Sequence, residues 1–126
     1  MSKPNSETQE QKKLIQAASK YPWGQFLFHI PNESIGGIGW LTRNRQMGMR
    51  PGVPDLFLPI PMGGYHGLFI EMKTATGRTS EHQKRWIKAL NTMGYKAVVC
   101  RGAFEALRLL KNYMEGKNAD NGETVE

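Results

Sequence analysis

The chain has a single cysteine, Cys100, among its 126 residues. One cysteine excludes an internal disulfide framework and a zinc site built from cysteines, and it fits a reducing intracellular compartment. No uninterrupted apolar run approaches the roughly 20 residues that a membrane-spanning helix needs. Residues 1–13 are polar, so no secretory signal is expected. These absences favour a folded cytoplasmic protein over a secreted or membrane-embedded one.

Acidic residues are also scarce in most of the chain. The whole sequence has 17 lysine and arginine residues against 11 aspartate and glutamate residues, a net charge of +6. Residues 115–126 hold four of the acids and one lysine, so residues 1–114 hold 16 basic and 7 acidic residues, a charge of +9. This excess favours a phosphate polyanion as the partner. Ordinary solubility charge is the alternative explanation.

The composition predicts one folded domain. Apolar residues make up 39% of the chain and there are three tryptophans, which argues against disorder. The length allows one core. We expect a disordered N-terminus over residues 1–6, the domain over residues 7–114 and an acidic mobile tail over residues 115–126.

Hydrophobic periodicity predicts seven elements, in the order helix–strand–strand–strand–helix–strand–helix. This order predicts an α/β (α+β) fold in which helices flank a mixed sheet, with the second and third strands paired as an antiparallel hairpin. Inward-facing residues of the last helix are expected to be Phe104, Leu107, Leu110 and Tyr113 or Met114. The predicted helices cover residues 7–20, 80–93 and 103–114, and the predicted strands cover residues 25–30, 55–60, 65–73 and 95–100.

A long loop is predicted over residues 31–52. This stretch contains five glycines, two prolines and three arginines, with no acid after Glu33. Long loops inside compact domains usually serve a function.

Two of the predicted strands carry charged residues that an interior strand does not usually hold. Asp55 follows Pro54 at the start of one strand, and Glu71 and Lys73 lie on the next. Residues two apart on a strand point to the same face, so Glu71 and Lys73 share a face while Met72 points to the other. Because burying an unpaired charge is costly, a metal ion is a common compensation for such acids.

Hairpin pairing would bring Asp55 beside Glu71, so that both carboxylates bind one divalent cation. Mg²⁺ and Mn²⁺ prefer oxygen ligands, and the backbone carbonyl of Met72 is a further candidate ligand. Lys73 would orient or deprotonate a water, or stabilise the negative charge that develops during phosphodiester cleavage. A surface ion pair is the alternative explanation of an isolated E-x-K.

The ordered set of motifs resembles the PD-(D/E)xK nuclease superfamily, whose restriction-endonuclease-like αβββαβ core matches the predicted element order. More narrowly, the chain resembles the VRR-NUC (virus-type replication-repair nuclease) domain from residue 7 to about residue 110. The stretches that carry this resemblance are Glu7-x-x-x-Gln11-x-x-Leu14, His29-Ile30-Pro31-Asn32, Gly52-Val53-Pro54-Asp55, Phe69-Ile70-Glu71-Met72-Lys73, Gly77-Arg78-Thr79-Ser80-x-x-Gln83 and Gly94-Tyr95.

The resemblance implies roles for the charged residues by position. Asp55 and Glu71 would bind the catalytic Mg²⁺ or Mn²⁺, and Lys73 would be the catalytic lysine. Glu7, on the first predicted helix, would be a further acid of the site. Glu10, one helical step away, is the alternative, although Glu7 shares its helix face with the apolar stripe. A simple helix-dipole role for Glu7 also stays open.

Three polar residues of the shared motifs have two explanations each. Gln83 would reach the metal water, Lys73 or a substrate phosphate, or it would form a capping box with Ser80. His29 and Asn32 lie where a strand meets a loop, where they would face the site or hold the turn.

Seven basic residues are candidate phosphate contacts, and a solvated basic surface is the alternative for each. Nothing in the chain resembles a helix-turn-helix or a zinc finger, so we expect recognition through phosphates and nucleic-acid shape. The candidates are Arg43, Arg45, Arg50, Arg78, Lys84, Arg85 and Lys88.

The resemblance implies a metal-dependent DNA endonuclease. Stand-alone members of the family, mainly phage and bacterial, are associated with cleavage of branched DNA, including Holliday-junction resolution, which implies the cytoplasm of a bacterial or phage-infected cell. A symmetric junction needs two matched cuts and therefore a homodimer. The alternatives are a flap or restriction-like nuclease, an RNA-directed nuclease and a non-catalytic nucleic-acid-binding module. Dimer contact and internal packing are both open for Trp40, Met47, Met49 and Met62.

Overall fold

The computed structural model describes residues 5–32, 37–117 and Glu123. Its centre is a four-stranded sheet in the order β1-β2-β3-β4. β1–β2 and β2–β3 are antiparallel pairs, and β3–β4 is a parallel pair. The predicted hairpin and the predicted mixed sheet are therefore confirmed. The strands are β1 (Phe28–His29), β2 (Leu56–Leu58), β3 (Leu68–Lys73) and β4 (Lys96–Arg101).

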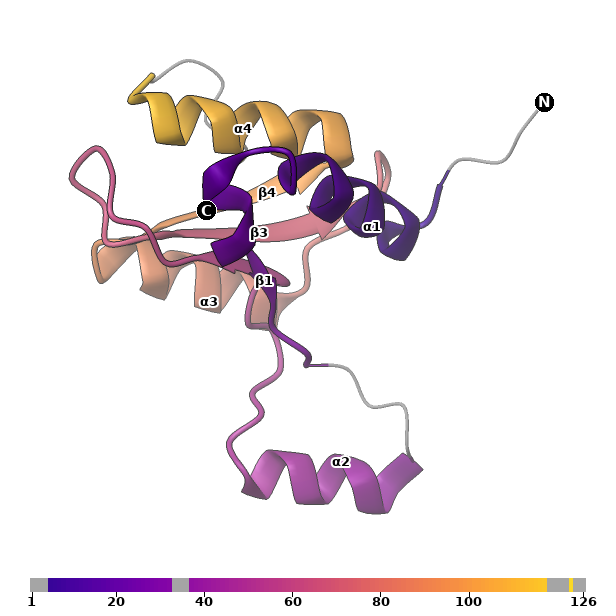
Figure 1. Ribbon diagram of the computed structural model, residues 1–126. Coiled ribbons are helices and arrows are strands. Elements are labelled where there is room, and N and C mark those ends of the chain that lie inside the picture. The colour runs from indigo at the N-terminus through magenta and orange to yellow at the C-terminus, as the bar shows by residue number, and fades with distance from the viewer. Residues whose placement is uncertain (1–4, 33–36, 118–122, 124–126) are drawn as a thin grey trace.

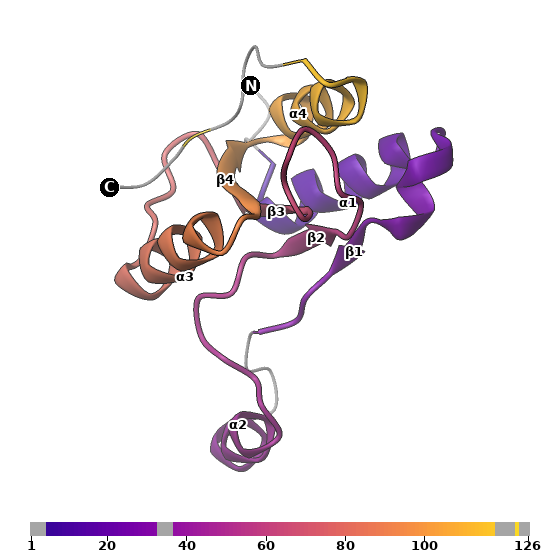
Figure 2. The same ribbon diagram turned by 90° about the vertical axis from the view of Figure 1, so that its left-hand side faces the viewer.

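Helices cover both faces of the sheet, which confirms the α+β fold class. α1 and α4 lie together on one face and α3 lies on the other, as Figures 1 and 2 show. α2 stands apart from the sheet and its covering helices. The helices are α1 (Glu7–Ala18), η1 (Pro22–Phe26, a 3₁₀ helix), α2 (Gly37–Gln46), α3 (Glu81–Thr92) and α4 (Ala103–Glu115).

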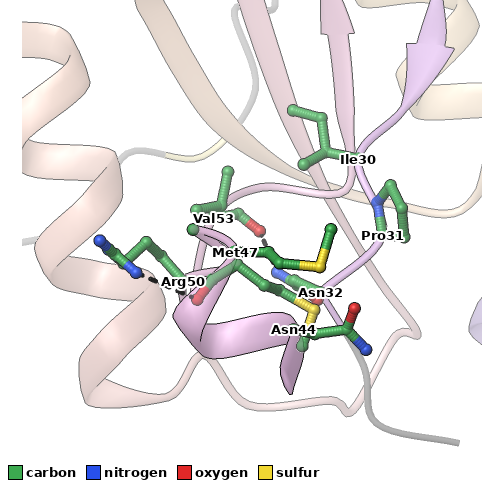
Figure 3. Close-up of a pocket in the computed structure, with 9 residues that line it drawn as sticks. Ile30, Pro31, Asn32, Asn44, Met47, Arg50 and Val53 are labelled. Carbon is green, nitrogen blue, oxygen red and sulfur yellow. Dashed lines mark hydrogen bonds between the residues drawn. The ribbon is translucent and has the colours of Figure 1, made fainter. Parts of the chain in front are cut away.

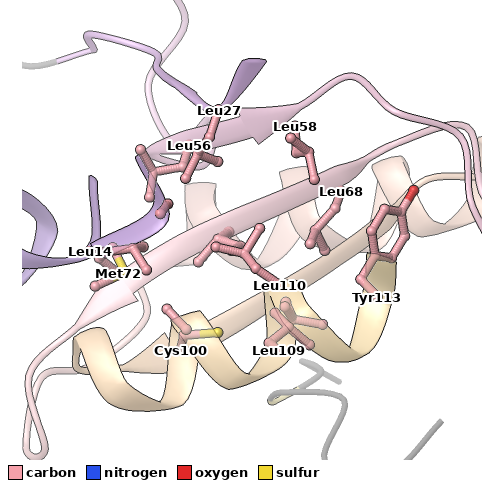
Figure 4. Packing of buried hydrophobic residues seen from close by; sticks show 14 residues of the cluster. Leu14, Leu27, Leu56, Leu58, Leu68, Met72, Cys100, Leu109, Leu110 and Tyr113 are labelled. Carbon is pink, nitrogen blue, oxygen red and sulfur yellow. The ribbon is translucent and has the colours of Figure 1, made fainter. Parts of the chain in front are cut away.

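The alternation of side chains along β3 divides the core into two layers. Leu68, Ile70 and Met72 are fully buried and pack toward α1 and α4 (Figure 4). Phe69 faces the other way and packs with Ile87 of α3 in the smaller cluster. Because successive strand residues alternate, Glu71 and Lys73 lie on the Phe69 side, at the end of β3.

Helix α4 faces the core with the predicted Leu110 and Tyr113, but Phe104 lies outside the core. Phe104 is 80% exposed and lies beside the guanidinium of Arg108, 5.8 Å from the ring centre. The prediction that Phe104 faces inward is therefore wrong. The sequence offers two overlapping apolar stripes at helical spacing, and the core buries Ala106 and Leu109 of the second stripe together with the shared residues Leu110 and Tyr113. The buried residues of α4 are Ala106, Leu109, Leu110 and Tyr113.

The predicted loop over residues 31–52 contains a helix, α2 (Gly37–Gln46). Five glycines and two prolines over residues 31–52 predict a loop, but residues 37–46 hold only two of those glycines and neither proline, and their other residues are ordinary helix formers. A second difference lies in the predicted strand over residues 25–30, whose first residues belong to η1. Pro22 stands at the start of η1, where its fixed φ suits a helical turn.

Most of the predicted disordered and mobile segments lie outside the described residues, which exclude residues 1–4, 118–122 and 124–126. Ser6 is described and forms the N-cap of α1, in a capping box with Gln9. In the predicted tail, Glu115 closes α4, and Glu123 exchanges two backbone hydrogen bonds with Val99. These residues of the predicted terminal segments are part of the fold.

Candidate active site

Three carboxylates from separate segments meet at one end of the sheet. They belong to Glu7 in the first turn of α1, Asp55 just before β2, and Glu71 on β3. One oxygen of each lies within 4.8 Å of the others. The register that pairs Leu56 with Ile70 places Asp55 opposite Glu71 when it is continued by one residue. The hairpin therefore sets two of the acids, and the N-terminal turn of α1 adds the third.

Backbone N–H groups hold both the side chain and the carbonyl oxygen of Asp55. Its Oδ2 accepts from the backbone N–H of Met72 at 2.9 Å. Its carbonyl oxygen accepts from the backbone N–H of Ile30 at 2.7 Å. The N–H and C=O of one strand residue point to the same side of the strand, so the carbonyl of Met72 also faces the Asp55 side. A Met72 carbonyl that faces Asp55 has the direction that its predicted role as a metal ligand requires.

Glu71 is 2% exposed, and only one of its two carboxylate oxygens has a hydrogen-bond or ion-pair partner among the described residues. Its Oε2 accepts from Nε2 of Gln83 at 3.1 Å and lies 3.8 Å from Nζ of Lys73. Its Oε1 is buried and, within the described part of the chain, has no hydrogen-bond partner. Burial, followed by the neighbouring charge of Asp55, raises the pKa of Glu71 to about 9. An unpaired buried oxygen is costly, and a bound cation would satisfy it.

Lys73 lies at the end of β3 with 8% of its surface exposed. Its ammonium group is directed to Glu71, at the 3.8 Å distance of the ion pair. The carbonyl oxygen of Lys73 accepts from the backbone N–H of Gly102 at 3.2 Å. The predicted grouping of Lys73 with Glu71 on one face is therefore seen in the structure.

Gln83 forms the predicted capping box and also reaches the acidic cluster, but with a partner other than those predicted. The side-chain Oε1 of Gln83 accepts from the backbone N–H of Ser80 at 2.9 Å, and the backbone N–H of Gln83 donates to Oγ of Ser80 at 3.2 Å. This arrangement is the predicted capping box of α3. Its Nε2 reaches the site as well, but the partner is the carboxylate of Glu71, where the predicted partner was a water, Lys73 or a phosphate.

The choice between Glu7 and Glu10 follows from what each carboxylate contacts. Glu10 Oε1 accepts from the backbone N–H of Ala103 at 2.9 Å, and its Oε2 accepts from Nδ2 of Asn5 at 2.8 Å. The hydrogen bond from Ala103 is the main reason that the pKa of Glu10 is lowered. Glu10 thus joins α1 to the start of α4, and Glu7 is the acid that joins Asp55 and Glu71.

His29 and Asn32 hold the backbone beside the site. Nδ1 of His29 lies 2.9 Å from the carbonyl oxygen of Asp55 and 3.1 Å from Nε2 of Gln11, and the tautomer of the ring decides which of these contacts is a hydrogen bond. Nδ2 of Asn32 donates to the carbonyl oxygen of Val53 at 2.6 Å. Both side chains therefore hold the turn and the segment that leads into Asp55.

The predicted phosphate contacts fall into two groups. Arg43 and Arg45 lie on α2 and Arg50 lies beyond it, all three exposed. The second group surrounds the start of α3, and its contact with a nucleic acid stays a prediction, as for the first group. Lys84 of this group lies 3.4 Å from Oε1 of Glu81, and its other members, all exposed, are Arg78, Arg85 and Lys88.

A groove of about 350 Å³ separates the end of α2 from the body of the protein (Figure 3). Met47, which is 74% exposed, Met49 and Ile30 are among the residues that line it. Met62, a further candidate dimer residue, packs against the main core instead. Trp40 belongs to α2, and its side chain lies outside the described part of the structure.

Sequence reasoning did not single out Arg101, the last residue of β4. Its guanidinium donates to the carbonyl oxygens of Thr74 and Gly77, both at 2.8 Å. Those residues follow Lys73 directly, and Arg101 is paired in register with Lys73 across the parallel strands. The only signal in the sequence is an arginine that directly follows the predicted strand over residues 95–100.

No helix among the described residues combines the length and the apolar character that a bilayer crossing requires.

A profile of the VRR-NUC domain matches residues 5–104. A solved structure described as a VRR_NUC domain protein superimposes with a TM-score of 0.80 at 25% sequence identity, covering 98% of this chain and 100% of that one. No curated protein matches the sequence. Because the profile spans most of the chain and the fold agrees, this protein belongs to the VRR-NUC family of PD-(D/E)xK-type nucleases.

Proposed function

We propose that this protein is a Mg²⁺- or Mn²⁺-dependent DNA endonuclease that cuts branched DNA. The observation that carries the proposal is the cluster of Glu7, Asp55 and Glu71, whose oxygens lie within 4.8 Å of one another beside a buried lysine. Three carboxylates this close repel one another unless protons or a cation compensate them. A cation is the more useful compensation in a nuclease.

The residues of the site fit a hard divalent cation. All three side chains offer carboxylate oxygens, the ligands that Mg²⁺ and Mn²⁺ prefer. The buried Oε1 of Glu71 supports the fit, because it lacks a partner among the described residues. Asp55, Glu71 and Glu7 would hold the ion, together with the backbone carbonyl of Met72. A bound divalent cation would supply Lewis acidity toward the scissile phosphate.

Lys73 has the positioning that a catalytic group needs. Its stem is buried and its ammonium is held beside Glu71, so little conformational freedom is left to lose when substrate binds. We assign it to donate hydrogen bonds to the attacking water or to the scissile phosphate, where negative charge develops. Gln83 orients the carboxylate of Glu71 and so acts on the site indirectly.

The substrate is bound mainly through its phosphates. Two groups of basic side chains, on and beyond α2 and around the start of α3, are the candidate contacts. Contacts of this kind follow the shape of the nucleic acid rather than its sequence, which suits a branched substrate. The enzyme would act in the cytoplasm of a bacterial or phage-infected cell.

A homodimer completes the proposal, because a symmetric junction needs two cuts. α2 supports it, since this helix stands apart from the body of the protein and would offer its free surface to a second copy (Figure 1). Met47, at the end of α2, is 74% exposed and is a candidate contact. In a closed dimer the same surface of both copies would meet.

The test is a nuclease assay on four-way junctions, flaps and linear duplexes, with matched RNA, in Mg²⁺ and in Mn²⁺. We expect the wild-type protein to cut the junction fastest and Glu71→Gln to be inactive. Faster cutting of flaps or linear duplex would favour the corresponding alternative nuclease. Metal-independent DNA binding without cleavage would favour a non-catalytic module and would overturn the proposal.

A further inference from the structure

Arg101 connects the outer strand of the sheet to the loop that follows Lys73. Its Nη1 donates to the carbonyl oxygens of Thr74 and Gly77, both at 2.8 Å, and lies 3.4 Å from the carbonyl oxygen of Ala75. One side chain therefore holds three carbonyls of residues 74–77. Hydrogen bonds from a charged donor are stronger than those from a neutral one, so this contact has a large effect on the shape of the loop.

The loop of residues 74–77 in turn packs against Lys73. A Cβ built on Gly77 would lie 3.4 Å from Cδ of Lys73 and 3.1 Å from Oγ1 of Thr74. The backbone N–H of Gly77 donates to that same Oγ1 at 3.1 Å. The lysine stem is therefore confined on one side by the loop, which is part of the reason that Lys73 is only 8% exposed. A shift of the loop would release the stem.

The same loop leads into α3, which carries Gln83, the second side chain that contacts Glu71. Ser80 caps α3 and Gln83 reaches Glu71 from its first turn. The loop thus lies between two side chains, Lys73 and Gln83, that touch one carboxylate. Within the described part of the chain, the Arg101 side chain forms no hydrogen bond or ion pair with either of them or with the three clustered acids, although its backbone is paired in register with Lys73.

Glu123 holds the guanidinium from the opposite side. Its Oε1 lies 3.1 Å from Nε of Arg101, and its Oε2 lies 3.5 Å from Nη2. Its backbone exchanges hydrogen bonds of 3.0 and 2.9 Å with Val99, on the outer edge of β4. The carboxylate and the loop carbonyls together use donors on all three guanidinium nitrogens, an arrangement that the fork of an arginine allows and a lysine does not.

We infer that Arg101 is a positioning residue of the nuclease site: it fixes residues 74–77 against Lys73, and Glu123 fixes Arg101. This inference rests on the proposed function, since it assigns Arg101 a part in the same reaction. Arg101 acts through Lys73 and does not bind the substrate. The Arg101 side chain is 27% exposed, and the donors of its guanidinium are directed to protein acceptors.

A direct phosphate contact by Arg101 makes different predictions. Loss of a phosphate contact weakens DNA binding and lowers the salt dependence of affinity by about one unit. Loss of a positioning contact lowers the rate of the chemical step while DNA affinity stays the same. Measurements of cleavage rate and of DNA affinity in Ca²⁺ on the same variants therefore separate the two roles.

The experiment compares Arg101→Gln, Arg101→Lys and Glu123→Gln with Lys117→Gln as the control. Lys117 follows the far end of α4, and its ammonium group forms an ion pair with Glu115. We expect Arg101→Gln to lower the single-turnover rate about 10- to 100-fold, the range for outer partners of a metal site. Arg101→Lys should restore part of the rate, and Glu123→Gln should lower it a few-fold. DNA affinity, its salt dependence and the control should match wild type.

Amide hydrogen exchange in the Asp55→Asn protein tests the loop without using activity. Addition of Arg101→Gln should speed exchange of residues 75–80 while β3 and β4 stay protected. Unchanged exchange in this loop would overturn the inference even if the nuclease is active. A fall in DNA affinity that matches the fall in rate would overturn it in favour of a phosphate contact. Absence of cleavage by wild type would overturn the proposed function alone, because the exchange measurement still tests the loop.

Discussion

Gln83 donates through Nε2 to Oε2 of Glu71 at 3.1 Å while its Oε1 caps α3. A single amide therefore sets both the start of a helix and the direction of a carboxylate in the acidic cluster. The oxygen of the Gln83 amide caps α3 and the nitrogen contacts Glu71, so substitutions can separate the helix cap from the contact with the acidic cluster.

Gln83→Glu should keep the capping box, which glutamate also forms, but replaces the amide donor with a fourth carboxylate beside Glu71. We expect cleavage to fall by about 10- to 100-fold, as for loss of an outer partner of a metal site, with little change in stability. Gln83→Ala should lose a similar share of activity and also about 1 kcal/mol of stability from the cap. Steady-state kinetics and urea unfolding check both variants; equal activity of Gln83→Glu and wild type would contradict the assignment.

The raised pKa of Glu71 predicts an unusual pH dependence for the metal-free protein. Because the folded state keeps the proton to about pH 9 while the unfolded chain loses it near 4.5, folding binds a proton between these values. The free energy of unfolding should therefore fall as the pH rises through this window, the opposite of a carboxylate held by a salt bridge.

Urea unfolding in EDTA from pH 5 to pH 9 measures this trend. Glu71→Gln should be more stable than wild type at pH 8 and should lack most of the decline. Saturating Mg²⁺ or Mn²⁺ should also remove the decline, because metal binding displaces the proton. A wild-type protein whose stability in EDTA rises across this range would contradict the description of Glu71.

Gly52 lies against the first turn of α3 just before the segment that carries Asp55. Its φ is +90°, and a Cβ there would lie 2.5 to 2.7 Å from backbone and Cβ atoms of His82. Gly52→Ala should cost about 1–3 kcal/mol of strain and a further 1–3 kcal/mol or so of overpacking. It should also disturb the site through Asp55.

Gly48→Ala is the matched control, because Gly48 also has a positive φ, +106°, but a Cβ there meets nothing within 4 Å. We expect it to show only the strain. Thermal unfolding of the two variants separates crowding from strain, and equal losses would contradict the close approach at His82.

The exposed arginines are predicted to contact phosphates. Arg43→Ala and Arg50→Ala should weaken binding to all DNA sequences alike and should each lower the salt dependence of affinity by about one unit. Lys117→Ala serves as the control, since this 65% exposed lysine lies past the far end of α4. Fluorescence anisotropy in Ca²⁺ at several salt concentrations gives these slopes. An unchanged slope in both arginine variants would place the DNA elsewhere.

Much of the fold could be predicted because the strands of the core are short apolar runs with turn residues at their ends. The stretch that ends in Glu71 and Lys73 is the clearest case, since the two-residue spacing alone places both charges on one face. The capping box of Ser80 and Gln83 was predictable for a similar reason, because it depends only on residues three apart.

Features that depend on tertiary contacts were not predictable in the same way. Glu7 and Glu10 both lie in the first turn of α1, and their roles are separated by distant partners: the N–H of Ala103, 93 residues later, binds Glu10, whereas Asp55 and Glu71 lie beside Glu7. Phe104 shares helical spacing with the buried Leu110 and Tyr113, yet its own side chain is exposed at the start of α4. Arg101 carries no local motif, because its partners come from a loop and from a residue at the other side of β4.

The most direct test of the account is an anomalous difference map from a crystal soaked in Mn²⁺, because it locates the ion independently of activity. We expect one strong peak between the carboxylates of Asp55 and Glu71, with Glu7 nearby, and no peak there in Glu71→Gln. A map without density at this end of the sheet, or with the ion bound elsewhere, would contradict the claim that these acids form the catalytic metal site.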